Sequence, residues 1–86
     1  MSREDEIRKE ILLQLYAVRP LALTAERIAR DAKKNDYDYA AGEIRREGEF
    51  LCDENLIAKI AEPGTTSVMY RINSNGVRQY EQKYAS

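Results

Sequence analysis

Residues 56 to 72 read Leu-Ile-Ala-Lys-Ile-Ala-Glu-Pro-Gly-Thr-Thr-Ser-Val-Met-Tyr-Arg-Ile. Two short runs that favour β-structure, residues 56–60 and 68–72, flank a polar stretch that contains Pro63-Gly64, a strong turn signal. This stretch therefore predicts an antiparallel β-hairpin with a long tip. Because the rest of the chain has helical spacing, the hairpin decides the fold class, which we expect to be α+β and mainly α.

The stretch that precedes the hairpin predicts three helices. In the first, from Arg3 to Val18, Ser2 is placed to cap the amino end and Pro20 to end the helix. Its apolar residues recur on one helical face: Ile7, Ile11, Leu12, Leu15 and Tyr16. A short extended segment, residues 21–23, follows, and Thr24 then caps a second helix from about Ala25 to Lys33.

A third helix is expected after the break at Asn35-Asp36, with Asp36 or Asp38 as its cap. The 3.6-residue period gives it a buried face made of Tyr37, Ala41, Ile44, Gly48 and Leu51. After the hairpin, Asn73 or Ser74 is expected to cap a last helix, in which Val77, Tyr80 and Tyr84 share a face.

Length and composition limit the functions that are open to this sequence. The chain has 86 residues, 43% of them hydrophobic, and we expect residues 1–86 to form a single domain. It has no His and one Cys, Cys52, which we expect in the core, so zinc sites of His and Cys and catalytic Ser-His or Cys-His groups are excluded. We therefore expect no enzyme, no metal and no cofactor.

The chain also lacks the sequence features of a membrane or exported protein. No apolar run approaches the roughly 20 residues that span a bilayer. The amino end is acidic, unlike a signal peptide, so we expect a cytoplasmic location and no membrane partner.

The predicted order of elements is a helix, a short extended segment, two helices, a hairpin and a last helix. This order resembles that of the winged helix-turn-helix superfamily. Three stretches carry the resemblance: Leu-Thr-Ala-Glu-Arg-Ile-Ala at 23–29, Leu-Cys-Asp-Glu-Asn-Leu-Ile at 51–57, and Tyr-Arg-Ile-Asn-Ser-Asn-Gly-Val at 70–77. The likeness covers nearly the whole chain. It implies a three-helix core, a wing at about residues 56–72 and a packed C-terminal helix.

This resemblance implies binding to double-stranded DNA, as in a small transcriptional regulator or a phage- or plasmid-type accessory protein. In that superfamily the third helix enters the major groove. Opposite Ile44, the far face of this helix carries Tyr39, Gly42, Glu43, Arg46 and Glu49, with Arg45 on its flank. The candidate base-contacting residues are Tyr39, Gly42, Glu43, Arg45 and Arg46. The alternative is that Arg45 and Arg46 are solvated and form ion pairs with Glu49 and Glu43.

Phosphate contacts are expected from a basic cluster on the second helix and the turn after it: Arg27, Arg30, Lys33 and Lys34. The tip of the hairpin has no Lys or Arg, so only hydroxyl groups such as those of Thr65 and Thr66 could bind a phosphate there. Residues 35–56 carry seven acidic and two basic side chains, and this net charge of −5 opposes DNA binding.

Two further hypotheses concern protein partners. The acidic third helix and the polar wing could form a protein-interaction module, with Glu47 and Glu49 in the contact. Val77, Tyr80 and Tyr84 could line a homodimer surface, which would present two third helices to DNA. The sequence shows no ligand pocket, so we expect a regulator that acts as a bare DNA-binding domain or through dimerisation.

Overall fold

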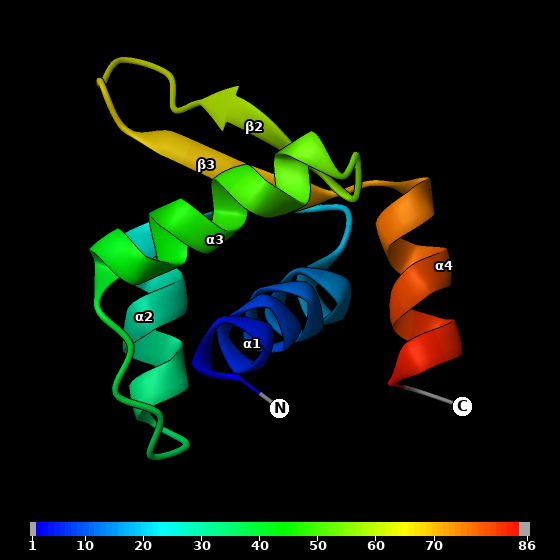
Figure 1. Cartoon of the computed structure of the whole chain (residues 1–86). Coiled ribbons are helices and arrows are strands. Elements are labelled where there is room, and N and C mark those ends of the chain that lie inside the picture. The colour runs from blue at the N-terminus through cyan, green and yellow to red at the C-terminus, as the bar shows by residue number, and fades with distance from the viewer. Residues whose placement is uncertain (1, 85–86) are drawn as a thin grey trace.

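The computed structural model describes residues 2–84 and has four helices and a three-stranded antiparallel sheet (Figure 1). The elements are α1 (Arg3–Val18), β1 (Leu23–Thr24), α2 (Ala25–Lys33), α3 (Ala41–Asp53), β2 (Ile57–Ala61), β3 (Val68–Ile72) and α4 (Ser74–Lys83). The expected α+β class with mainly helical content is confirmed.

The sheet contains the expected hairpin and one strand more. β3 lies between β1 and β2, and it pairs with β2 from Ile57 opposite Ile72 to Ala61 opposite Val68. The segment expected to be extended also pairs with β3, where Leu23 lies opposite Tyr70. Pairing with β1 therefore ties the connection between α1 and α2 to the hairpin.

Three of the expected helix caps are present. The side chains of Ser2, Thr24 and Asn73 each accept a hydrogen bond from the backbone N–H three residues later, at 3.1, 3.1 and 2.9 Å. Such bonds satisfy amide groups that have no partner within the first helical turn. The amino ends of α1, α2 and α4 therefore lie where the sequence predicts.

The predicted start of the third helix is wrong. α3 begins at Ala41, with Ala40 in the capping position, and neither Asp36 nor Asp38 caps it. Asp36 has a positive φ of 66°, which ends the turn after α2, and Tyr37 is 46% exposed. Residues 37–40 form a connecting segment instead. The buried face of α3 still includes Ile44, Gly48 and Leu51, as expected.

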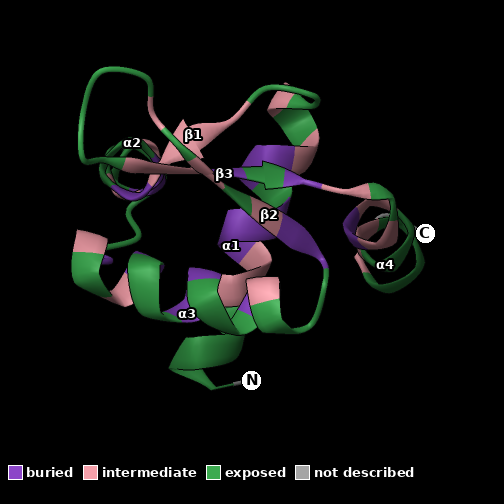
Figure 2. Ribbon diagram, turned by 90° about the horizontal axis from the view of Figure 1, so that it is seen from above, coloured by how far each residue is buried: buried purple, intermediate pink, exposed green. Residues whose placement is uncertain are grey.

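The core surrounds α1, which lies between α2 and α4 and beneath α3 and the sheet (Figures 1 and 2). Ile7, Ile11 and Leu15 of α1 are fully buried, and Cys52 packs against the core, as expected. No helix in the described part of the chain combines the length and the apolar character needed to cross a bilayer.

Two glycines differ in the space around them, and this difference gives a test of the packing. A Cβ on Gly76 of α4 would lie 2.1 Å from the carbonyl oxygen of Leu56, whereas a Cβ on Gly42 of α3 would meet nothing within 4 Å. We expect Gly76→Ala to cost about 1–3 kcal/mol or more through overpacking against backbone. Gly42→Ala should stabilise the protein by about 0.5–1 kcal/mol through helix propensity.

Urea unfolding of the two variants, followed by circular dichroism, measures both effects. Equal stability of Gly76→Ala and the wild type would contradict the close approach of α4 to the start of β2.

Candidate nucleic-acid interface

The outward face of the first half of α3 presents Gly42, Arg45 and Arg46, all of which are exposed. This face points away from Ile44, which is fully buried. Because Gly42 has no side chain and nothing lies near it, another molecule can approach the helix backbone there. These three predicted residues are therefore accessible on one surface.

Arg45 lies where α3 meets α2 and the hairpin loop, residues 62–67. Its Nη1 atom forms an ion pair with Glu26 Oε2 at 2.6 Å, and both side chains are at least half exposed. Arg45 and Glu26 line a hollow of about 190 Å³ together with Thr66 and Ser67 of the loop. Thr66 thus lies close to the predicted α3 surface, whereas the Thr65 hydroxyl bonds within the loop, to the carbonyl of Glu62.

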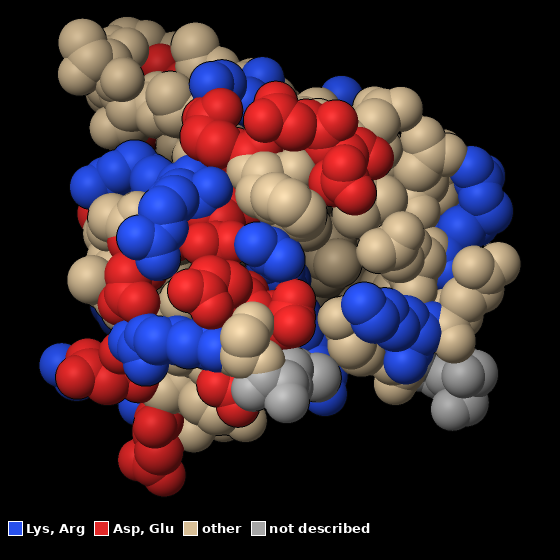
Figure 3. All heavy atoms as spheres, viewed as in Figure 1, with Lys and Arg blue, Asp and Glu red and all other residues tan. Residues whose placement is uncertain are grey.

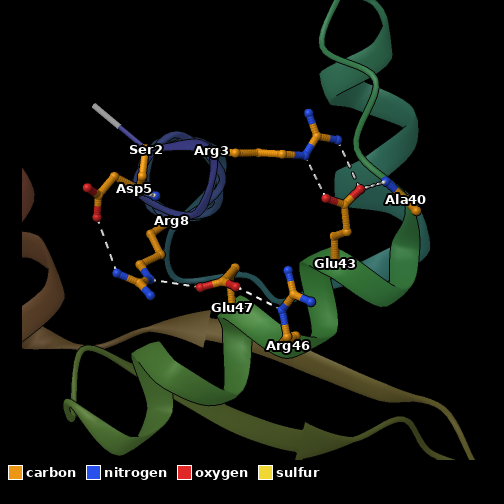
Figure 4. A network of polar contacts seen from close by, with 8 residues as sticks. All are labelled: Ser2, Arg3, Asp5, Arg8, Ala40, Glu43, Arg46 and Glu47. Atoms are coloured by element: carbon orange, nitrogen blue, oxygen red, sulfur yellow. Dashed lines mark hydrogen bonds and ion pairs between the residues drawn. The ribbon is translucent and has the colours of Figure 1, made fainter.

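Arg46 and Arg8 of α1 both bind the carboxylate of Glu47 (Figure 4). Arg46 Nε donates to Glu47 Oε2 at 3.1 Å, and Arg8 Nε donates to Glu47 Oε1 at 2.8 Å. Glu47 is only 3% exposed, whereas the Arg46 side chain is 65% exposed. The expected pairing of Arg45 and Arg46 with Glu49 and Glu43 is therefore wrong, and Glu47 cannot take part in a protein contact at the surface.

Glu43 belongs to the seam between α1 and α3. Its two oxygens accept from Arg3 at 2.7 and 3.0 Å, and Oε1 also accepts from the N–H of Ala40 at 3.1 Å (Figure 4). The hydrogen bonds from Arg3 and then from the Ala40 backbone lower the pKa of the Glu43 carboxyl to about 2. Both oxygens thus serve the cap and Arg3 in the folded chain, and contact of Glu43 with a base stays a prediction.

Tyr39 precedes α3 and is only 7% exposed, so its predicted place on the outward face is wrong. Its ring stacks parallel to that of Tyr37, with centroids 5.6 Å apart, and the Arg3 guanidinium lies 5.2 Å from its centroid. Residues 37–40 are not helical, so helical spacing does not give the direction of the Tyr39 side chain.

The basic cluster on α2 is partly neutralised by Asp31. Arg27 Nε and Lys34 Nζ lie 3.1 and 3.4 Å from the Asp31 carboxylate. Burial acts to raise the pKa of that carboxyl, but Arg27 and Lys34 together lower it below its ordinary value. Arg30 and Lys33 are exposed and form no ion pair within residues 2–84.

The second half of α3 is acidic at the surface. Glu49, Asp53 and Glu54 are exposed, and Figure 3 shows acidic side chains gathered over this part of the helix. Lys59 of β2 lies 2.8 Å from Glu49, and the Arg8 guanidinium lies 3.7 Å from the centroid of the Phe50 ring, which is 42% exposed. This half is therefore a mixed acidic and apolar surface.

The residues predicted for a dimer surface pack within their own chain. Tyr80 of α4 stacks on Tyr16 of α1, with ring centroids 4.5 Å apart, and the centroid of Tyr84 lies 5.6 Å from that of Tyr80. Val77, Tyr80 and Tyr84 are all partly buried against the core. These contacts attach α4 to α1, and dimerisation itself stays a prediction.

Sequence reasoning missed the polar residues that α1 contributes. Arg3 and Arg8 bind α3, and Glu10 and Gln14 are buried. The α3 partners of Arg3 and Arg8 are distant in the chain, so no local spacing signals them, whereas the bond between Glu10 and Gln14 joins residues at i and i+4. Among the residues that the structure describes, no group of three or more Cys, Asp or Glu side chains could hold a metal ion.

Comparison of the chain with protein-family models, with curated proteins and with solved structures finds no match.

The lowered pKa of Glu43 makes its contribution to stability dependent on pH. In the unfolded chain this carboxyl takes up a proton near its ordinary pKa of 4.5, but in the folded chain only near pH 2. Its contribution should be complete above about pH 5 and lost as the pH falls toward 2. We expect the difference in unfolding free energy between wild type and Glu43→Gln to shrink over that range.

Urea titrations from pH 7 to 2 measure the difference. Arg3→Gln removes the guanidinium that pairs with Glu43, so its difference in unfolding free energy from the wild type should also shrink as the pH falls. Parallel pH profiles in the wild type and both variants would contradict the contact.

Glu47 and Glu49 form a matched pair for testing the buried contact. Glu47→Ala leaves Arg8 and Arg46 without their shared acceptor, and we expect a loss of about 1.5–3 kcal/mol. Glu49→Ala breaks only an exposed pair with Lys59, which is worth less than about 1 kcal/mol. Chemical unfolding measures both, and equal losses would show that Glu47 is not the stronger support of α3.

Proposed function

We propose that this chain is a winged helix-turn-helix protein that binds double-stranded DNA without catalysis, as a small regulator or accessory protein does. The observation that carries the proposal is the exposed surface of Gly42, Arg45 and Arg46 on the first half of α3, beside the hairpin loop. In helix-turn-helix proteins the second helix of the pair enters the major groove with its amino-terminal residues on base edges. α2 and α3 pack against each other and supply such a pair.

The ion pairs of the two arginines do not prevent DNA binding. Pairs between exposed side chains are worth about 0–1 kcal/mol, so Arg45 can exchange Glu26 for a phosphate oxygen at little cost. Arg46 can leave Glu47 because Arg8 continues to pair with that carboxylate. Each guanidinium presents the donors that match a phosphate or the acceptors of guanine.

Two other groups of side chains suit contacts with the DNA backbone. Arg30 and Lys33 on α2 are exposed and unpaired within the described chain, and the first helix of such a pair crosses the phosphates. On the other side of Arg45, the Thr66 hydroxyl in the hairpin loop can donate to a phosphate oxygen.

A second candidate function is binding to another protein through the second half of α3. The observation that favours it is the exposed Phe50 ring among the carboxylates of Glu49, Asp53 and Glu54. A partner with basic side chains around an apolar one would complement this surface. The same carboxylates would repel phosphate, so the two functions make opposite demands on the second half of α3.

Salt-dependent binding to a random-sequence duplex tests the proposed function. We expect measurable affinity that falls as salt rises, and Arg45→Ala and Arg46→Ala should each weaken it. If each arginine contacts a phosphate, each change should reduce the slope of log affinity against log salt by about 1. If Arg46 contacts guanine, Arg46→Ala should cost about 1–3 kcal/mol on a selected site and relax one base preference.

Arg78→Ala on α4 is the control, because Arg78 is exposed but lies outside α2, α3 and the hairpin. Glu49→Gln should strengthen binding to the random duplex by removing a charge beside the phosphates. Absence of salt-dependent binding by the folded wild type would reject the DNA proposal and favour the protein-binding alternative.

A further inference from the structure

A cleft runs along α1 on the side that faces α2 and the segment before α3, away from the surface described above. We call it the α1 cleft. It consists of two adjoining hollows of about 440 and 210 Å³ that share Glu10, Leu13 and Asn35 in their walls. The larger hollow lies within the range of about 300–1,000 Å³ that small-molecule sites occupy.

The walls of the α1 cleft include two buried polar side chains that bond to each other and have no cationic partner. Glu10 is 7% exposed and Gln14 is 9% exposed. Gln14 Nε2 donates to Glu10 Oε2 at 2.7 Å and to the carbonyl of Ile28 at 3.0 Å, but Gln14 Oε1 is buried without a hydrogen bond. No Lys or Arg within residues 2–84 forms an ion pair with Glu10.

Such groups are costly to bury, and a ligand that donates hydrogen bonds would offset the cost. Glu6 lines the larger hollow and adds to its negative charge, whereas Asp31, which lines the smaller hollow, is balanced by Arg27 and Lys34. Lys9 lines the larger hollow, but its Nζ lies 5.2 Å from the centroid of the Tyr84 ring, toward α4.

Aromatic and apolar groups form the remaining wall. Tyr37 and Tyr39 stack with an angle of 5° between their rings, and Tyr37 and Leu13 are both exposed large side chains. Burial, followed by the charge of Glu6, raises the pKa of Tyr39, and the Glu10 charge adds to this shift. An aromatic face beside carboxylates attracts organic cations through both the ring quadrupole and direct charge.

We propose that the α1 cleft binds a small organic cation, an ammonium or guanidinium ion that carries an apolar chain or ring. The cationic group donates hydrogen bonds to the Glu10 carboxylate, and the apolar part lies on Leu13 and Tyr37. This site is separate from the proposed DNA surface, and the proposal does not depend on DNA binding.

Titration of the full chain with 2-phenylethylamine, followed by amide chemical shifts in NMR spectra, tests the proposal. The neutral 2-phenylethanol, which has the same ring and chain length, is the matched probe. We expect saturable shifts for residues 6–18 and 31–39 with the amine, and at least about tenfold weaker binding of the alcohol. No saturable shifts with the amine, or equal affinity for the alcohol, would overturn the proposal.

Three variants locate the site. Glu10→Gln should weaken amine binding by about tenfold, whereas Glu4→Gln, an exposed change on the first turn of α1, should leave it unchanged. Tyr37→Ala alters an exposed side chain and should weaken binding several-fold even if Glu10→Gln proves unstable. Wild-type affinity in Tyr37→Ala, or in folded Glu10→Gln, would overturn the assignment to this cleft.

Discussion

The position of α3 depends on the buried carboxylate of Glu47. A carboxylate that is 3% exposed is stable in a protein only if it is paired, and Arg8 of α1 supplies the pair at 2.8 Å. Arg3 binds Glu43 one helical turn earlier along α3, so two ion pairs run along the same seam between the helices (Figure 4). With Ile44 buried below, they fix which side of α3 faces outward, and therefore which of its arginines are accessible.

Features that depend on neighbouring residues were predictable from the sequence. The caps at Ser2, Thr24 and Asn73, the end of α1 before Pro20 and the turn at Pro63-Gly64 all follow from a few adjacent side chains. The outward position of Arg45 and Arg46 was also predictable, because it needs only the helical period and one buried reference residue. These local rules gave the helices and the hairpin, but not the partners of the charged groups.

Features that depend on distant residues were not predictable. Glu47 looks like any surface acid until Arg8, 39 residues earlier, lies beside it. Helical spacing continued back to Tyr37 predicts an outward Tyr39, whereas Asp36 has a positive φ and both tyrosines lie in a connecting segment before α3. The α1 cleft likewise needs α1, α2 and that segment together, so its buried acceptors leave no pattern in the sequence.

The tertiary contacts also change what the net charge of −5 between residues 35 and 56 means. Glu43 and Glu47 face Arg3 and Arg8, which lie outside that segment, so their charges are balanced within the seam. The exposed carboxylates of α3, Glu49 and Asp53, lie in its second half, and Glu54 follows directly after the helix. Under the proposed function, a duplex would therefore lie toward the amino end of α3. There Arg45 borders the hairpin loop and α2, and a phosphate would lie away from the carboxylates of Glu49, Asp53 and Glu54.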